Sequence, residues 1–180
     1  MTAWVMKTLN VSQDHANHLR QKYWETYGTT LAGLMREHDM DPVPYLDDVH
    51  DIDFTALPTD PELAAAIAAL PGRRIIYTNA CEPYARRVLA ARGLSGLFDA
   101  VYGVEHADFL PKPERAAFER IFARDGLDPT AAAMFEDDPR NLAAPHAMGL
   151  RTVLVAPDLH VADHIHHHTD DLTAFLTQLT

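Results

Sequence analysis

The sequence has few of the features that mark secreted, membrane or nucleic-acid-binding proteins. Cys81 is its only cysteine, which excludes an internal disulfide and is typical of a reducing compartment. No apolar run approaches the ~20 residues that span a bilayer, and the N-terminal region shows no signal-peptide pattern. Acidic residues outnumber basic ones by 26 to 15, so the surface should repel nucleic acid. We expect a cytoplasmic protein that binds neither membranes nor nucleic acid.

The composition is otherwise that of a folded protein, with 47% apolar residues among 180. This is enough for the core of one domain, or of a domain with a small appendage. Residues 1–56 contain no convincing strand, because their apolar residues recur at helical spacing and Ser12 is suited to cap a helix. We therefore predict a small helical subdomain over residues 1–56.

From Thr59 onward, short apolar strands alternate with helices. Strands are predicted at 74–77, 100–104, 132–135 and 151–155, and helices at 59–70, 83–93, 114–124, 141–148 and 169–179. The alternation predicts an α/β fold, a parallel sheet with helices on both faces. In such a sheet, ligands bind beyond the carboxyl ends of the strands.

Three polar features fall at those ends or in the loops beside them. They are Thr78-Asn79, Lys112 between two prolines, and the acids Glu136-Asp137-Asp138. Each alone has a commoner structural explanation: a turn, a solvated side chain or a helix cap. Together they can serve phosphate chemistry, because a hydroxyl and an amide bind phosphate oxygens, a lysine neutralises developing charge and a carboxylate holds Mg²⁺.

These motifs resemble those of a known family. Thr78-Asn79, Pro111-Lys112-Pro113 and Glu136-Asp137-Asp138 with Asn141 look like the second, third and fourth motifs of the haloacid-dehalogenase (HAD) superfamily of phosphohydrolases. The stretches 27–34 and 49–53 are similar to its pyrimidine 5'-nucleotidase-like branch. The resemblance covers essentially the whole chain. It implies a helical cap over residues 1–56 and a Rossmann-like core over residues 57–180.

The resemblance also implies a role for each motif residue. Thr78 would bind phosphate with Asn79 beside it, and Lys112 would stabilise the developing charge. Asp137 would be the main ligand of Mg²⁺, with Asp138 at the same metal site. The implied substrate is a small phosphorylated compound, such as a pyrimidine nucleoside monophosphate, and the assembly is left open between a monomer and a homodimer.

The chain departs from the family at its first motif. HAD phosphatases begin with an apolar strand ending in Asp-x-Asp, whose first aspartate is the nucleophile, and the cap region here has no such strand before it. We expect a phosphomonoesterase fold without its first strand, weak Mg²⁺ binding and no turnover. A natural start further upstream would explain the departure. The alternative is a catalytically dead remnant that binds phosphate, a nucleotide or a partner chain.

Asp51-Ile52-Asp53 matches the Asp-x-Asp pattern literally and makes Asp51 an alternative nucleophile. The residues before it form a poor buried strand, however, since a central parallel strand is nearly continuous in apolar residues. In the family sheet the absent strand lies between those ending at Thr78 and Glu136. Unpaired buried backbone groups cost ~1–3 kcal/mol each. We therefore expect the neighbouring strands to close up, residues 49–54 to fill the slot, or a second chain to fill it.

Three further features leave alternatives open. Five histidines between 160 and 168 include pairs at four-residue spacing, which suits either a solvated approach to a helix or a transition-metal site. Tyr23, Trp24 and Tyr27 form a stripe that is either core or a nucleobase contact, and residues 27–34 are the better candidate for substrate contact. Cys81 near a helix start has either a lowered pKa or a packing role.

Overall fold

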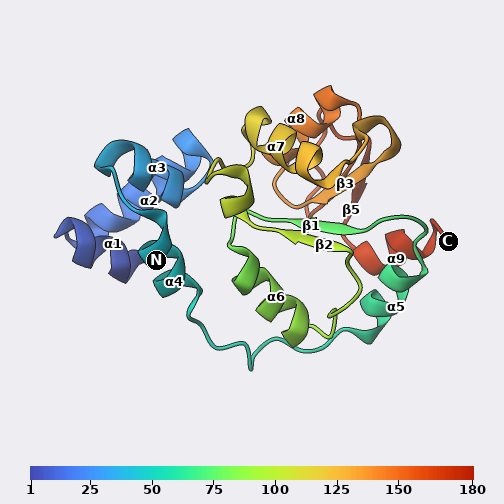
Figure 1. Ribbon diagram of the computed structural model, residues 1–180, viewed down its shortest axis with the longest axis horizontal. Coiled ribbons are helices and arrows are strands. Elements are labelled where there is room, and N and C mark those ends of the chain that lie inside the picture. Colours follow the sequence, from blue (N-terminus) through green and yellow to red (C-terminus); the bar gives the residue numbers. More distant parts are fainter.

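The computed structural model describes residues 1–180 and shows an α/β protein with a helical region at one end (Figure 1). The helical region comprises α1 (Thr2–Leu9), α2 (Gln13–Tyr27), α3 (Thr30–His38) and α4 (Pro42–His50). The strands are β1 (Ile75–Tyr77), β2 (Ala100–Tyr102), β3 (Ala133–Glu136), β4 (Arg151–Val155) and β5 (His167–Thr169). The remaining helices are α5 (Pro61–Ala69), α6 (Glu82–Ala91), α7 (Arg115–Asp125), α8 (Arg140–Met148), α9 (Leu172–Thr177) and the 3₁₀ turns η1 (Val104–Ala107) and η2 (Pro129–Ala131). No helix is long and apolar enough to cross a membrane.

The helical region forms because polar residues cap its helices and apolar residues fill the space between them. The Ser12 hydroxyl accepts from the backbone N–H of His15, as the sequence predicts, and Asp41 caps α4 in the same way. The close crossing of α2 and α3 requires Gly33, because an added Cβ there would lie 2.1 Å from the Tyr23 ring. Helix α4 falls within the region predicted to be helical, although the sequence analysis assigned no particular helix to Pro42–His50.

All strand pairs are parallel, and four of the five strands match the predicted ones. They form two separate sheets, β1-β2 and β3-β4-β5. Helices cover both faces of the sheets, as neighbouring residues on β3 show. Met134 packs against the cluster built on α7, which includes the fully buried Phe118, whereas Phe135 packs against α5 and α9. The parallel sheet with helices on both faces, expected from the strand and helix pattern, is therefore present, and it is the Rossmann-like core that the resemblance implies.

The sheet is interrupted between β1 and β3. The two strands are not paired, so the predicted closing of the neighbours does not occur. Residues 49–54 do not fill the slot either. They lie along α6, where the Arg87 guanidinium donates to the carbonyls of His50 at 3.2 Å and Ile52 at 3.1 Å. Both of these expectations are wrong. Arg87 holds residues 49–54 beside α6, and the ends of β1 and β3 are joined by the Lys112 side chain rather than by a backbone ladder. Filling of the slot by a second chain stays a prediction.

The histidine-rich stretch contains strand β5 rather than the approach to a helix. His166 Nδ1 lies 2.8 Å from the Thr152 hydroxyl, and His168 Nε2 lies 2.8 Å from the carbonyl of Ala156. His164 Nε2 similarly lies 2.9 Å from the Pro139 carbonyl. These rings fasten β5 and the preceding loop to β4 and α8. The helical spacing on which the metal-binding alternative depended is absent, because residues 160–168 contain a turn, a bend and the start of β5 and no helix.

Candidate active site

A pocket of about 740 Å³ opens at the carboxyl ends of β1 and β3, facing the helical region. The core contributes the side chains that the motifs predict, and the helical region supplies the opposite wall. Its lining consists of Trp24, Gly28, Thr29, Thr78, Asn79, Lys112, Glu136, Asp137, Asp138, Pro139, Arg140 and Asn141. All five predicted site residues therefore meet in one place, although their roles stay predictions.

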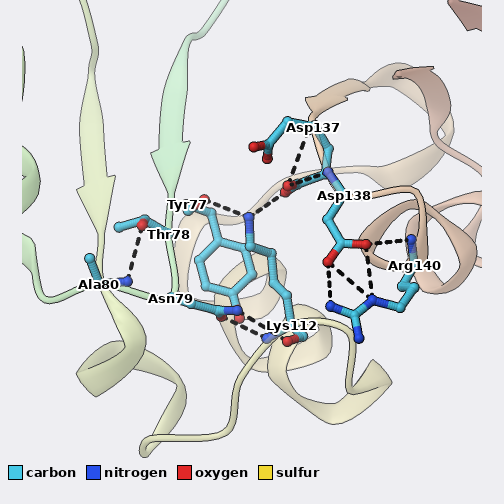
Figure 2. Close-up of polar contacts among 9 residues, drawn as sticks. Tyr77, Thr78, Asn79, Ala80, Lys112, Asp137, Asp138 and Arg140 are labelled. Carbon is cyan, nitrogen blue, oxygen red and sulfur yellow. Dashed lines mark hydrogen bonds and ion pairs between the residues drawn. The ribbon is translucent and has the colours of Figure 1, made fainter. Parts of the chain in front are cut away.

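Lys112 is the buried centre of this pocket, with 7% of its surface exposed. The Asn79 amide holds its backbone from both sides: Nδ2 donates to the Lys112 carbonyl at 3.1 Å, and Oδ1 accepts from the Lys112 N–H at 2.8 Å. The ammonium donates to the Tyr77 carbonyl at 3.3 Å and forms an ion pair with Glu136 (Figure 2). Lys112 thereby bridges the ends of β1 and β3, and Asn79 fixes its position.

Glu136 is the counter-ion that lets Lys112 remain buried. One oxygen contacts the ammonium, and the other accepts from the N–H groups of Asp137 at 3.2 Å and Asp138 at 3.3 Å. Burial by itself raises the pKa of Glu136, but the Lys112 charge and these donors outweigh it and bring the pKa below its ordinary value. Sequence reasoning missed this pairing. The sequence did offer one indication. A lysine that is buried at the strand ends requires a counter-ion, and Glu136 at the end of the following strand is a candidate.

Asp137 carries the exposed carboxylate of the acidic cluster and takes part in no ion pair. Hydrogen bonding to the neighbouring Glu136 carboxylate raises the pKa of Asp137, and partial burial and the Glu136 charge act in the same direction. A divalent cation would relieve this repulsion, and carboxylate oxygens are what Mg²⁺ prefers. Asp137 therefore fits the predicted metal site.

Asp138 is engaged differently. Its carboxylate receives Arg140 Nη2 at 2.6 Å and Nε at 3.0 Å, and it also accepts from the Arg140 backbone N–H at 3.0 Å. Burial raises the pKa of Asp138, but the guanidinium outweighs this and lowers it overall. Because Arg140 occupies both oxygens, Asp138 fits a metal ligand less well than Asp137 does.

The helical region meets the core at two points beside the pocket. The Arg140 guanidinium lies 3.8 Å from the centre of the Trp24 ring and donates to the Trp24 carbonyl at 3.3 Å. Gly28 abuts the lysine loop, since an added Cβ would lie 2.7 Å from the Lys112 carbonyl oxygen. Within the predicted contact stretch 27–34, Gly28 and Thr29 line the pocket, whereas Leu31 and Leu34 are core residues.

The remaining candidates have definite places. The Thr78 hydroxyl accepts from the Ala80 N–H at 3.0 Å, which leaves its own hydrogen free to donate into the pocket. Asp51 ends α4 in an exposed position and is not among the pocket residues. Cys81 lies 3.1 Å from His50 Nδ1, and burial raises the pKa of its thiol, so a reactive thiol is not favoured.

Comparison with known proteins identifies the family. A model of the haloacid dehalogenase-like hydrolases matches residues 7–149, which include most of the helical region and strands β1, β2 and β3. The chain belongs to this family.

Individual relatives are distant. The HAD-like chain is 25% identical over 163 residues to phosphate metabolism protein 8 of Saccharomyces cerevisiae, with 81% of this chain and 50% of that protein covered. The chain thus spans half the length of this curated relative. A HAD phosphatase from Thermococcus onnurineus superposes with a TM-score of 0.63 at 17% identity, covering 99% of this chain and 86% of that one. The HAD hydrolase YfnB of Bacillus subtilis, solved bound to magnesium, gives 0.62 at 16% identity, with 98% and 88% covered.

The HAD-like core also holds an acidic group away from the pocket, which sequence reasoning missed. Glu82, Glu105 and His106 bring their ligand atoms within 4.8 Å of one another. Their own contacts account for much of this closeness: Glu105 accepts from the Glu82 N–H at 2.7 Å, and the Gly103 N–H donates to His106 at 3.0 Å. The group secures the start of α6 against η1.

Proposed function

We propose that this pocket binds the phosphate group of a small phosphorylated compound together with Mg²⁺, as part of a HAD-type phosphomonoesterase site. The observation that carries the proposal is the convergence of three groups from three separate loops on one pocket. Thr78 offers a hydroxyl donor, Lys112 an ammonium and Asp137 an unpaired carboxylate. No single structural role explains why all three face the same space.

Each group has a part in holding a phosphate. The Thr78 hydroxyl donates to a phosphate oxygen, and Lys112 neutralises the charge on the oxygens while Glu136 keeps the ammonium in place. Asp137 would hold Mg²⁺, whose charge, when bound, stabilises the negative charge of the phosphoryl group. Asn79 acts on the substrate indirectly, through the backbone of Lys112.

The pocket carboxylates are all otherwise engaged, and this bears on turnover. Glu136 pairs with Lys112, Asp138 pairs with Arg140, and Asp137 is assigned to the metal. Asp51 lies outside the pocket. Covalent phosphoryl transfer of the HAD type uses a carboxylate that is free to attack. We therefore propose that the 180 residues bind phosphate without hydrolysing it, and that hydrolysis requires a further aspartate at the gap between β1 and β3.

The proposed substrates are pyrimidine nucleoside monophosphates. Support comes from the likeness of residues 27–34 and 49–53 to the nucleotidase-like branch, and from a pocket of about 740 Å³, which is large enough for a nucleotide. A second candidate, binding of a partner chain without chemistry, is favoured by the unpaired edges of β1 and β3.

Calorimetric titration and a phosphatase assay test the proposal together. The chain is titrated with UMP and with inorganic phosphate, with and without Mg²⁺, and is assayed on UMP, CMP and an aryl phosphate. Thr78→Val should weaken phosphate binding, and Asp137→Asn should remove the effect of Mg²⁺. Asp51→Asn, the matched acid outside the pocket, should change neither. Robust turnover by this chain that Asp51→Asn abolishes would overturn the assignment of the site.

A further inference from the structure

One wall of the pocket differs in chemistry from all the others. Among the residues that line it, Trp24 is the only aromatic one, and 45% of its surface is exposed. The opposite side carries the charged and hydroxyl groups proposed to hold phosphate. A phosphate ester bound at Lys112 therefore has a single flat apolar surface available for the group attached to its phosphate.

The exposure of Trp24 is not general to aromatic residues of the helical region, since others there are packed against neighbouring side chains. Tyr23 is 2% exposed, and its hydroxyl lies 2.7 Å from His38 Nε2. Trp4 packs edge-on against Tyr45, with ring centroids 5.0 Å apart. Because 45% of Trp24 is exposed, it gains less from burial than the packed aromatic residues do, and a further contact holds it at the pocket.

That contact is Arg140. The Asp138 carboxylate holds the guanidinium at 2.6 and 3.0 Å, and the same guanidinium lies over the indole at 3.8 Å and donates to the Trp24 carbonyl. A planar guanidinium held by a carboxylate keeps one orientation, which a flexible ammonium could not do. Asp138 thus fixes the orientation of Arg140, and Arg140 in turn fixes the orientation of the Trp24 ring on the opposite wall.

We propose that Trp24, positioned by Arg140, is the surface on which the leaving group of the substrate packs, and that it selects phosphate esters whose leaving group carries a flat heterocyclic base. This inference rests on the proposed phosphate site and adds to it the residue that recognises the base of the leaving group. Trp24 is the binding residue. Arg140 is a positioning residue, which acts through the indole.

The selectivity follows from stacking. A heterocyclic base that stacks on an aromatic side chain gains affinity of about tenfold or more. A sugar phosphate without a base has no flat surface to present, and inorganic phosphate uses only the charged side. The site should therefore rank UMP above ribose 5-phosphate, with the ranking dependent on Trp24.

The test uses Trp24 as its own reporter. The chain contains two tryptophans, so Trp4→Phe leaves Trp24 as the single tryptophan, whose emission is excited apart from that of the tyrosines. UMP should change the emission of Trp24 at saturation, whereas inorganic phosphate should leave it close to its starting value. In the reciprocal Trp24→Phe protein, the emission of Trp4 should respond to neither ligand.

Affinities measured by calorimetry then assign the roles. Trp24→Ala should weaken UMP about tenfold and leave ribose 5-phosphate and inorganic phosphate unchanged. Trp24→Phe should retain part of the preference. Arg140→Lys keeps the charge beside Asp138 but loses the flat stack, so it should lower the preference for UMP, shift Trp24 emission to longer wavelength and spare phosphate binding.

The outcomes separate this inference from the proposal beneath it. If the wild-type chain binds all three ligands equally, or if Trp24→Ala weakens all three alike, the role of Trp24 is wrong and the phosphate site stands. If the chain binds no phosphate at all, the proposed function is overturned and this inference falls with it.

Discussion

The pocket has two ion pairs that are built in opposite ways. We call Asn79, Lys112 and Glu136 the pocket floor, and Trp24, Asp138 and Arg140 the pocket rim. In the floor pair, the lysine and glutamate side chains are 9% and 6% exposed, whereas in the rim pair the arginine and aspartate side chains are 34% and 23% exposed. The floor joins two strand ends of the core, and the rim joins the core to the helical region.

The difference in burial suits the floor pair to binding the phosphate group and the rim pair to recognising the rest of the ligand. A buried pair loses hydration and must satisfy its remaining hydrogen bonds within the protein, which the floor does through Tyr77 and the two N–H groups beyond Glu136. Such a pair is costly to disturb, so it suits a fixed charge for phosphate. A rim pair in contact with solvent is weaker and easier to rearrange. Its part is to orient the Trp24 ring, through the guanidinium that lies over it, rather than to supply a fixed charge for phosphate.

The largest expected effect is at the floor. Lys112→Met leaves Glu136 buried without its counter-ion, and breaking such a pair costs about 3–5 kcal/mol. Urea denaturation should therefore show a large fall in the free energy of unfolding. The double variant Lys112→Met with Glu136→Gln removes both charges and should recover much of that loss while phosphate binding stays absent. If the single and double variants have the same free energy of unfolding, leaving Glu136 without its counter-ion is not what destabilises the single variant.

The next effect concerns how closely the helical region approaches the floor. Gly28 has φ +84° and its Cβ position lies 2.7 Å from the Lys112 carbonyl oxygen, whereas Gly126 has φ +76° with nothing within 4 Å. Gly126→Ala should cost about 1 kcal/mol for the left-handed backbone alone. Gly28→Ala should cost about 1–3 kcal/mol more from overpacking, and should weaken phosphate binding by displacing the lysine loop. Equal losses from the two variants, measured by thermal and urea unfolding, would show that the contact is not tight.

Most of the core and the membership of the pocket could be predicted from the sequence. Apolar runs and their Gly and Pro boundaries located four strands, and the carboxyl-end rule placed Thr78, Lys112 and Asp137 together. These features depend on local periodicity, which a sequence displays directly. Strand β5 was missed because a short edge strand rich in histidine has no apolar signature.

The contacts within the pocket could not be predicted, because they join residues far apart in the chain. Nothing near Lys112 indicates that Glu136 neutralises it, and nothing near Trp24 indicates that Arg140 lies over its ring. Asp138 illustrates the limit. The family resemblance places Asp138 with Asp137 at the metal site, and no sequence pattern indicates that Arg140, two residues on, donates to the Asp138 carboxylate. Which of the two acids holds Mg²⁺ stays a prediction. The sequence of a motif shows which residue types are present. The role of each residue depends on where its side chain points, which only the structure shows.

A smaller effect is expected at the rim. Asp138→Asn removes the charge that holds Arg140 and should cost about 1 kcal/mol or less, because the pair is partly solvated. If Asp137 is the metal ligand, Asp138→Asn should leave Mg²⁺ affinity nearly unchanged, and Asp137→Asn should abolish it. Calorimetry with Mg²⁺ on both variants makes the comparison. A larger loss of Mg²⁺ binding in Asp138→Asn would restore Asp138 to the metal site.

The smallest effect is expected for the surface ion pair that also joins the helical region to the core. Arg36 pairs with Glu114, with side chains 44% and 32% exposed, and the Arg115–Glu119 pair within α7 is a matched exposed control. Arg36→Gln and Arg115→Gln should each change the free energy of unfolding by less than about 0.5 kcal/mol, and the changes should shrink further as salt is added. Fluorescence of Trp24 in the Arg36→Gln protein should stay that of the parent. If Arg36→Gln alters this fluorescence as strongly as Arg140→Lys does, the surface ion pair holds the helical region as firmly as the rim does. The distinction between the two contacts would then be wrong.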